Sequence, residues 1–269
     1  MELRRLEEQE HQKTRKLWEE VFSDDTRAFL DYYYFIKTKE NEIWVIEEDG
    51  EIQSMLQLNP YQLQVAEHPF LCRYIIAVAT RAQYRSRGYM SSLLRKAMQE
   101  MYGKKEPFTF LMPAAEAIYT PYDFRFVYSQ RQAVFEKKAE TELIEEEDAT
   151  MFQAEELAAF AKERLFGTAR VYAVRDAHYY QTRVLEQQSE NGGIRMLKKD
   201  GKLVGIYCYA KEETCEVLEP LILPGYETVF WDSISGLSEK PVKVLACPEV
   251  LEPCARWCLY RVALSQLLE

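Results

Sequence analysis

The sequence lacks any apolar run long enough to cross a membrane. A spanning helix needs about 20 consecutive apolar residues, and no stretch of this chain approaches that length. The first ten residues mix charged and apolar side chains and do not form the apolar core of a signal peptide. We therefore expect a cytoplasmic protein with no membrane partner.

Basic residues are in the minority. The chain has 34 Lys and Arg against 44 Asp and Glu, which gives a formal net charge of −10. A protein that binds nucleic acid needs a basic face to neutralise phosphates, so we expect no nucleic-acid partner. An acidic surface serves solubility and also attracts cationic molecules.

Patterns for metal binding and for disulfides are also missing. The six cysteines contain no Cys-x-x-Cys pair, and the three histidines are far apart in the sequence. In a cytoplasmic protein such cysteines are typically reduced thiols of the core, so we expect neither a structural disulfide nor a metal site. The cysteines are Cys72, Cys208, Cys215, Cys247, Cys254 and Cys258, and the histidines are His11, His68 and His178.

Glycine is scarce, which makes the position of Gly88 informative. It is the only glycine between Gly50 and Gly103, and it follows a basic turn that begins after an apolar strand. At such a point the backbone either approaches a bound group or adopts a positive φ. Beyond it, apolar residues recur at intervals of three and four, which predicts a helix that begins within residues 88–92. They are Met90, Leu93, Leu94, Ala97, Met98 and Met101.

The turn has the features of an anion-binding loop. The first amides of a helix lack intrahelical acceptors, and the helix dipole adds partial positive charge there. Arg85 and Arg87 add two full charges just before the helix. The alternative is an ordinary corner between a strand and a helix, with a solvated basic turn.

The strand, turn and helix together resemble the acyl-coenzyme A motif of the GNAT N-acetyltransferases. The motif core, Arg/Gln-x-x-Gly-x-Gly/Ala, maps onto Arg85-x-x-Gly88-x-Met90, with Met90 where a small residue is usual. The Eis (enhanced intracellular survival) branch is similar to this chain in accepting a larger residue there. The resemblance implies that acetyl-coenzyme A is the co-substrate. It also implies that the backbone of Val78 and Thr80 holds the pantetheine arm, and that the amides of Arg85, Ser86, Arg87, Gly88, Tyr89 and Met90 hold the pyrophosphate.

A second segment, from Phe110 to Phe126, is similar to another signature of the Eis branch. The resemblance implies that Tyr119 is the general acid that protonates the leaving thiolate. A packing tyrosine on a short helix is the alternative for this residue. Glu116 and Asp123 are candidates for orienting or deprotonating the amine, although surface solvation explains both, so no general base is assigned.

The order of elements predicts an α+β chain of two tandem GNAT-like domains, each with a mixed, mostly antiparallel sheet flanked by helices. We expect a catalytic domain at 1–140 with the coenzyme loop, and a degenerate second unit at 141–269 that lacks an Arg-x-x-Gly loop and binds no coenzyme. The boundary precedes four consecutive carboxylates at residues 145–148, which we interpret as a solvated linker or loop.

Periodicity and turn residues predict the individual elements. In the first domain we expect helices at 12–22, 26–37 and 90–102, and strands at 42–47, 52–58, 61–66, 70–80, 108–112 and 128–137, the last of which closes the sheet. In the second we expect helices at 151–166, 177–187 and 226–237, and strands at 193–198, 203–210, 214–221 and 242–247. The aromatic run at residues 32–35 fits either a helix that packs on a sheet or a base-stacking platform.

The reaction implied by the resemblance is transfer of an acetyl group from acetyl-coenzyme A to a primary amine of a small molecule or of a protein lysine. The acidic charge favours a cationic amine, and a homo-oligomer is left open. The alternatives are a non-catalytic acyl-coenzyme A binding module or sensor, and aminoacyl transfer from tRNA, which the acidic charge disfavours. Fuller members of the branch continue into a sterol-carrier-like domain, and the resemblance implies that their C-terminal carboxylate acts as the base in the active site. Glu269 does not simply inherit that role.

Overall fold

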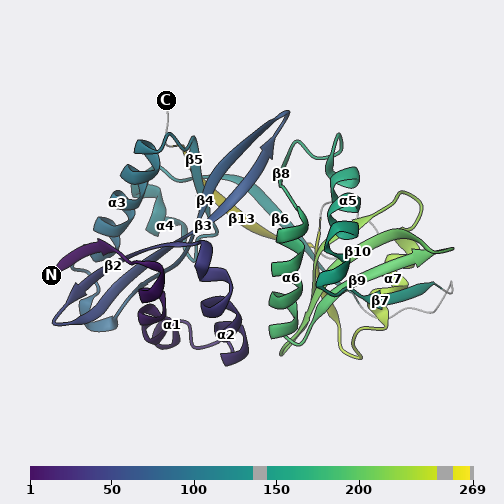
Figure 1. Cartoon of the computed structure of the whole chain (residues 1–269), viewed down its shortest axis with the longest axis horizontal. Coiled ribbons are helices and arrows are strands. Elements are labelled where there is room, and N and C mark those ends of the chain that lie inside the picture. Colours follow the sequence, from purple (N-terminus) through teal and green to yellow (C-terminus); the bar gives the residue numbers. More distant parts are fainter. Residues whose placement is uncertain (136–143, 247–256, 267–269) are drawn as a thin grey trace. The chain divides into compact units, whose positions relative to one another are not determined.

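The computed structural model describes residues 1–135, 144–246 and 257–266, which fall into two compact units (Figure 1). Unit 1 consists of Met1–Tyr128 with Arg261–Glu269, and unit 2 of Ser129–Tyr260. These bounds differ from the ranges 1–140 and 141–269 expected from the sequence, because the end of the chain groups with unit 1. The expected boundary near residue 140 lies outside the described residues. No helix in the described part of the chain is long and apolar enough to span a membrane.

The sheet of unit 1 has the strand order β1-β2-β3-β4-β5-β13. Neighbouring strands are antiparallel except β4 and β5, which are parallel. The strands are β1 (Glu2–Arg5), β2 (Glu42–Glu48), β3 (Glu51–Val65), β4 (His68–Thr80), β5 (Phe108–Leu111) and β13 (Trp257–Gln266). The short edge strand β1 was not anticipated from the sequence.

Helices cover both faces of this sheet. Leu56 and Leu58 of β3 pack in one core cluster with α3, whereas the alternate residues Gln57 and Asn59 accept hydrogen bonds from Tyr33 of α2 on the opposite face. The helices are α1 (Arg15–Val21), α2 (Arg27–Phe35), α3 (Tyr89–Gly103) and α4 (Glu116–Tyr119). The shorter 3-10 turns are η1 (Glu8–Thr14), η2 (Lys37–Glu40), η3 (Ala82–Tyr84) and η4 (Thr120–Tyr122).

The aromatic run on α2 belongs to the core and forms no base-stacking platform. Tyr32, Tyr33 and Tyr34 are buried, and only Phe35, at 59% exposure, faces outward. The helix starts at Arg27 because the hydroxyl of Thr26 accepts the amide hydrogen of Phe29 at 3.1 Å, which caps the first turn.

Strand β3 corrects the expectation of two separate strands at 52–58 and 61–66. It runs without interruption through Pro60, which pairs with Arg73 of β4 between the pairs Asn59↔Tyr74 and Tyr61↔Cys72. A proline ends a strand only where its missing N–H is required for the ladder. Pairing with β4 on both sides of Pro60 therefore keeps the strand continuous.

Strands β4 and β5 form a fork. Their parallel pairing contains Arg73↔Thr109 and Tyr74↔Phe110, and no further pair is found in the described residues although β4 continues to Thr80. Just past the last pair, Ala77 adopts a φ of 52° and the register with β3 shifts, which marks a β-bulge. The bulge bends β4 away from β5, so the edge of β4 beyond Tyr74 is left without its parallel neighbour.

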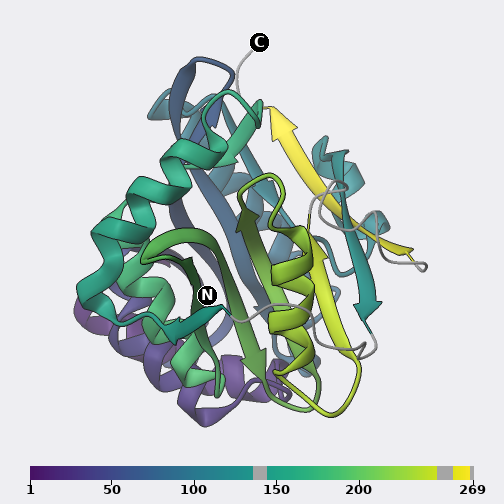
Figure 2. The ribbon, with the colours of Figure 1, turned by 90° about the vertical axis from the view of Figure 1, so that its right-hand side faces the viewer.

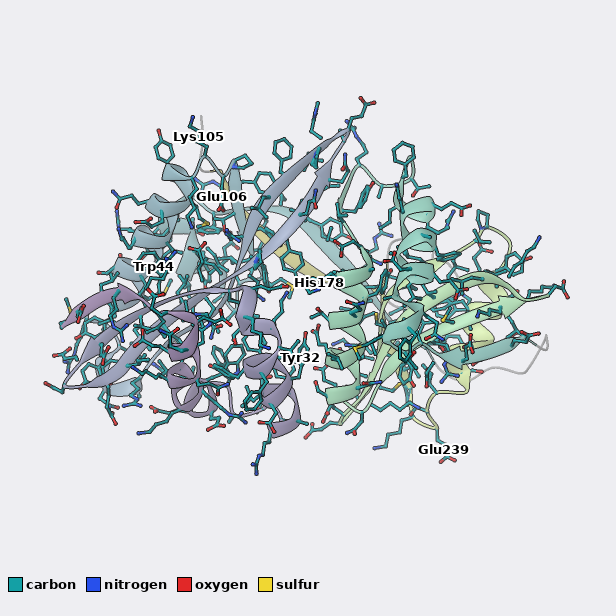
Figure 3. The ribbon with its side chains drawn as sticks, viewed as in Figure 1. Tyr32, Trp44, Lys105, Glu106, His178 and Glu239 are labelled. Atoms are coloured by element: carbon teal, nitrogen blue, oxygen red, sulfur yellow. The ribbon has the colours of Figure 1, made fainter. Side chains whose placement is uncertain are left out.

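Polar side chains hold the closed end of the fork. The Thr109 hydroxyl donates to the Arg73 carbonyl at 2.6 Å. The Arg73 guanidinium lies 3.2 Å from Glu106, at the start of β5, and 3.2 Å from Glu42 of β2. Glu106 is buried below the end of α3 (Figure 3), and this burial raises the pKa of its carboxyl group although Arg73 opposes the shift.

Unit 2 repeats the order of unit 1. Its sheet has the order β6-β12-β11-β10-β9-β7, with β11 and β12 parallel and joined by the helix α7 (Figure 2). The strands are β6 (Arg125–Phe135), β7 (Glu145–Asp148), β8 (Val171–Ala173), β9 (Gly193–Lys199), β10 (Lys202–Lys211), β11 (Cys215–Ile222) and β12 (Val242–Ala246). The helices are η5 (Met151–Gln153), α5 (Ala154–Leu165), α6 (Ala177–Ser189) and α7 (Glu227–Ser235). The fold is thus a tandem of two mixed, mostly antiparallel α+β units, as the sequence predicts.

The strand that completes each sheet is not the one that the order along the chain suggests. The segment 128–137 was expected to close the first sheet, but residues 131–135 of β6 pair with β12 of unit 2. The strand next to β5 in unit 1 is instead β13, through residues 263–266. Periodicity could not show this, because it identifies a strand but not its partner.

The four carboxylates at residues 145–148 form the edge strand β7, which corrects their interpretation as a linker or loop. They pair with β9, whose Arg195 binds Glu146 at 2.9 Å and Asp148 at 3.0 Å. Lys198 of β9 binds Glu147 at 2.6 Å. Cross-strand cations of this kind offset the repulsion that would otherwise disfavour an acidic strand.

The ion pairs at the closed end of the fork generate a prediction on stability. Arg73→Met leaves the buried carboxylate of Glu106 without its ion-pair partner, whereas Glu42 keeps Lys104 at 2.6 Å, and removing one partner of a buried pair costs about 3 kcal/mol. We expect a loss of this size in the free energy of unfolding, measured by urea titration. Lys13→Met, which removes an exposed pair with Glu10, serves as the control and should change the value by less than about 0.5 kcal/mol. Equal effects of the two substitutions would contradict the role given to Arg73.

Candidate active site

The end of strand β4 presents the two residues predicted to hold a pantetheine arm. Val78 and Thr80 are half-buried and lie on the part of β4 that has separated from β5. Ser54 of β3 fixes this end, because its hydroxyl donates to the Ala79 carbonyl at 2.9 Å and lies 2.8 Å from the Thr80 hydroxyl. The unpaired edge of β4 is therefore held in an extended conformation.

The basic turn that follows is exposed and sharply bent. Gly88 has a φ of 80°, which is one of the two possibilities that the sequence leaves open, and Ser86 also has a positive φ, of 61°. A Cβ atom at Gly88 would meet no other protein atom within 4 Å, so within the protein it is the backbone conformation that requires the glycine. Successive amides around left-handed residues point into one concavity, which is an anion-binding arrangement.

Helix α3 adds its free amides to this concavity. Its first intrahelical bond runs from the Ser92 amide to the Gly88 carbonyl at 3.0 Å. The amides of Tyr89, Met90 and Ser91 come before that bond and have no intrahelical acceptor. The loop and the helix start thus offer backbone amides without an intrahelical acceptor to an anionic group.

The two loop arginines are exposed but held in place. The Arg85 Nε donates to the Thr80 carbonyl at 3.2 Å, and the Arg87 guanidinium lies 4.7 Å from the centre of the Tyr84 ring. Each contact leaves other guanidinium N–H groups available for an anion. Positive charge therefore remains at the mouth of the concavity.

The side chains of Tyr89 and Met90 both pack in the core cluster beneath α3. Tyr89 is buried, and its hydroxyl donates to Glu48, which raises the pKa of Tyr89. Met90 packs against the core cluster beneath α3. This explains why a large residue is accepted at the position where the family motif has a small one: the backbone faces the anion site and the side chain fills the core.

Tyr119 ends the short helix α4 and packs against the same core cluster as Val78 and Met90. Its ring lies 5.7 Å from that of Phe124 in an edge-on arrangement. Burial raises the pKa of the Tyr119 hydroxyl, so the group is protonated at neutral pH. The structure thus brings the predicted acid and the coenzyme segments to one cluster.

Glu116 and Asp123 are exposed. Asp123 has a φ of 62° and lies 3.3 Å from Arg125, which agrees with a role at the surface. Neither residue is thereby identified as a general base.

Tyr74 is a residue of this region that the sequence did not single out. It occupies the last paired position of β4 before the fork opens, and its ring lies 5.2 Å from that of Phe110. Burial raises its pKa to about 12, although hydrogen bonding with the backbone of Met112 opposes the shift. In the sequence Tyr74 is one aromatic residue of a strand, and only the pairing shows that it borders the fork.

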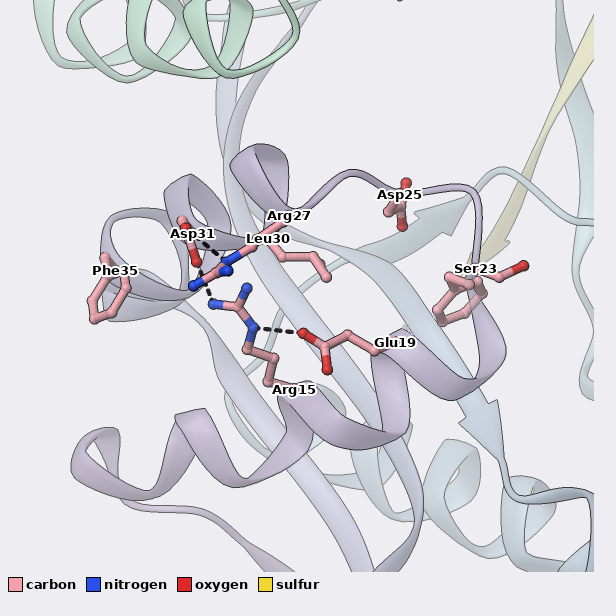
Figure 4. A pocket seen from close by; sticks show the side chains of 9 residues that line it. Arg15, Glu19, Ser23, Asp25, Arg27, Leu30, Asp31 and Phe35 are labelled. Atoms are coloured by element: carbon pink, nitrogen blue, oxygen red, sulfur yellow. Dashed lines mark hydrogen bonds and ion pairs between the residues drawn. The ribbon is translucent and has the colours of Figure 1, made fainter.

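A pocket of about 690 Å³ opens between α1 and α2 (Figure 4). Three carboxylates and two guanidinium groups line it, and Arg15 binds Glu19 at 2.9 Å and Asp31 at 2.6 Å. None of the lining residues was assigned to the active site from the sequence. They are Arg15, Glu19, Phe22, Ser23, Asp25, Arg27, Leu30, Asp31 and Phe35.

The corresponding loop of unit 2 has different chemistry. Its helix α7 follows β11 as α3 follows β4, and Gly225 has a φ of 88°. The Gly225 amide, however, donates to the carboxylate of Glu227 at 2.9 Å. A carboxylate at the helix start repels a phosphate, which supports the expectation that this unit binds no coenzyme.

The conformation of Gly88 leads to a prediction. Gly88→Ala places a Cβ in open space but forces a left-handed residue, which costs about 1–2 kcal/mol. Gly103→Ala, at the other end of α3, is the control, because Gly103 has no positive φ and no atom near the added Cβ. We expect the thermal unfolding midpoint to fall for Gly88→Ala and to stay constant or rise for Gly103→Ala. A loss of the same size in both variants would contradict the conformational explanation.

Comparisons with known proteins agree with this geometry. A family profile described as "Acetyltransferase (GNAT) domain" matches residues 2–127. A search of curated proteins gives no match.

Solved structures share the fold of nearly the whole chain. A conserved protein of unknown function from Enterococcus faecalis V583, described as a probable N-acyltransferase, has a TM-score of 0.81 at 14% identity and covers 99% of this chain and 72% of its own. A GCN5-related N-acetyltransferase from Kribbella flavida has a TM-score of 0.77 at 14% identity, and the match covers 99% of this chain and 72% of that protein. Eis1 from Mycobacterium abscessus has a TM-score of 0.67 at 12% identity, and the match covers 99% of this chain and 74% of that protein. Residues 2–127 thus match the GNAT acetyltransferase domain family, within a chain whose fold is shared along nearly its whole length with structures that include Eis1.

Proposed function

We propose that the protein transfers an acetyl group from acetyl-coenzyme A to a primary amine of a small molecule or of a protein lysine, and that the amine is cationic. A GNAT domain is an acyltransferase domain, which gives the class of reaction. The observation that carries the proposal is the fork between β4 and β5, which opens directly towards the anion-binding turn 85–90.

The fork accounts for how an extended ligand would be held. Beyond Tyr74 the backbone of β4 has no pair with β5 in the described residues, and Val78 and Thr80 lie on this free edge. A pantetheine arm carries amide groups and can bind such an edge in the way that an added strand does. Its pyrophosphate would then reach the amides of the turn and the start of α3.

Tyr119 supplies the proton in this proposal. Acetyl-coenzyme A provides the acetyl group as a thioester, from which the amine, attacking in its neutral form, displaces the thiolate. The proton that the nitrogen loses as the amide bond forms replaces the one that Tyr119 gives to the sulfur. Because burial raises the pKa of Tyr119, its hydroxyl retains its proton at neutral pH until the sulfur acquires charge. A positioned proton donor of this kind contributes about 10²–10⁴-fold to a rate.

The charge of the protein supports a cationic acceptor. The net charge is −10, and an excess of one sign of charge on a protein raises the local concentration of oppositely charged molecules. Polyamines, aminoglycosides and lysine peptides are therefore the first amines to test.

Thiol release from acetyl-coenzyme A, measured over that panel of amines, tests the acid. Tyr119→Phe should lower kcat by about 100-fold or more, because the hydroxyl is lost and the packed ring is kept. Tyr122→Phe removes a neighbouring hydroxyl and should leave kcat within about twofold. Unchanged turnover of Tyr119→Phe would remove Tyr119 as the acid. Coenzyme binding without turnover on any amine would favour a non-catalytic module instead.

The raised pKa of Tyr119 predicts the pH dependence of kcat. The group is the acid in its protonated form, and its pKa lies above the ordinary value of 10.0, so it is fully protonated from about pH 6 to pH 9. We expect no decline of kcat that depends on Tyr119 within this range. A descending limb below pH 9 that disappears in Tyr119→Phe would contradict the assignment.

The anion-binding turn is tested by the thermal stabilisation that coenzyme A gives to the protein through mass action. The double substitution Arg85→Glu with Arg87→Glu should abolish this stabilisation, because it reverses both charges at the turn. The double substitution Lys39→Glu with Lys202→Glu changes the net charge equally at exposed positions outside the turn and should preserve it. If the arginine variant keeps the stabilisation, the turn is not the pyrophosphate site.

A further inference from the structure

Arg81 lies between the last residue of β4 and the turn η3, and it differs from the other arginines of this region. Its side chain is 8% exposed, whereas Arg85 and Arg87 are exposed to solvent. A guanidinium group is rarely buried unless it is paired. The burial of Arg81 therefore requires a structural explanation, whereas the exposed Arg85 and Arg87 require none.

The side chain of Arg81 joins two other elements of unit 1. Its Nε donates to a carboxylate oxygen of Glu20 on α1 at 3.0 Å. Its Nη1 donates to Glu51, at the start of β3, and to the side-chain oxygen of Gln53 at 3.4 Å. One cation thus connects a helix and a strand that are separated from it by many residues.

The backbone of Arg81 is fixed as well. Its amide donates to the Gln53 carbonyl at 2.9 Å, and its carbonyl accepts the Tyr84 amide hydrogen at 2.9 Å. The first of these bonds extends the β4 pairing to β3, and the second begins the turn that leads into Arg85 and Gly88. Arg81 is therefore the point at which the rigid sheet passes into the anion-binding loop.

The carboxylates around Arg81 keep its guanidinium group charged. Burial lowers the pKa of the guanidinium group, but its contacts with Glu51 and Glu20 outweigh this and raise it. In return the hydrogen bond from Arg81 lowers the pKa of Glu51. A charged pair retained at such a point serves to fix one conformation more than to add stability.

We propose that Arg81 is a positioning residue for the coenzyme loop, which rests on the function proposed above. It holds the free edge of β4 and the turn at residues 85–88 at a fixed distance from α1 and β3, and it touches neither substrate. Helix α1 also provides Arg15 and Glu19 to the pocket. The same ion pair therefore links the coenzyme loop to the helix that lines the pocket.

The experiment compares Arg81→Gln and Arg81→Lys in the full chain. Arg81→Gln should raise the KM for acetyl-coenzyme A and the Kd of coenzyme A by about tenfold, since small misplacements of a positioned group cost up to about 100-fold. The kcat at saturation should stay within about twofold. Arg81→Lys keeps the charge but cannot reach both carboxylates in a forked geometry, so it should recover part of the loss.

A matched control separates positioning from stability. Arg4 also binds two carboxylates, Glu10 at 2.8 Å and Glu47 at 3.0 Å, but it lies on β1 and outside the loop. Arg4→Gln should lower the thermal midpoint and leave the KM for acetyl-coenzyme A unchanged. If the KM for acetyl-coenzyme A rises equally in Arg4→Gln and in Arg81→Gln, general destabilisation explains the increase and the proposal is overturned.

Hydrogen exchange gives a readout that needs no coenzyme. In Arg81→Gln the amides of residues 85–91 should exchange faster, while those of α7 in unit 2 keep their rates. If the loop amides keep their rates and the Kd of coenzyme A does not change, Arg81 does not position the loop. If the wild-type protein itself neither binds coenzyme A nor releases thiol, the proposed function fails, whereas faster loop exchange in Arg81→Gln would still show that Arg81 holds the turn.

Discussion

The early end of the pairing between β4 and β5 is the constraint on which the site depends. Parallel strands that continued side by side would leave no free backbone edge, and the bulge at Ala77 prevents this. The diverging part of the strand is then fixed at both ends by ion-paired arginines. Arg73 holds the closed end through Glu106, and Arg81 holds the open end through Glu20 and Glu51. Between them the backbone of β4 is extended, unpaired on one side and aligned with the turn that follows.

The two units show how one fold can keep or lose this site. Both have hairpins followed by a parallel pair that is joined through a helix, and both have a bulge with a positive φ, at Ala77 in β4 and at Glu219 in β11. In unit 2 the bulge carries a carboxylate, which accepts a hydrogen bond from Tyr179 at 2.6 Å and lies 3.3 Å from Arg183. Burial raises the pKa of Glu219, but the neighbouring arginines outweigh this and lower it. Internal ion pairs thus occupy a place that in unit 1 is left to a small residue.

Features set by neighbouring residues could be predicted from the sequence, and features set by distant partners could not. Helix α3 follows from the spacing of apolar residues and is confirmed. The scarcity of glycine singled out Gly88, which has the positive φ that was one of the two possibilities. Strand β7 was missed because its carboxylates are neutralised by cations of β9, which no local pattern shows. The inward direction of Arg81 depends in the same way on Glu20 and Glu51. The roles of Tyr119 as the acid and of Val78 and Thr80 as coenzyme residues stay predictions. Tyr119 and Val78 pack against one core cluster, and Val78 and Thr80 lie on the same strand, β4.

The exchange of β6 and β13 has a consequence for the order in which the protein can fold. Strand β5 belongs to unit 1, but its outer neighbour β13 comes after all of unit 2 in the chain. While the chain is being synthesised, the edge of β5 therefore stays open until residues 263–266 have emerged. Open edges recruit other strands, and contacts of such long sequence separation form slowly. A ribosome that pauses within unit 2 would thus prolong the time in which the nascent first unit is prone to aggregate.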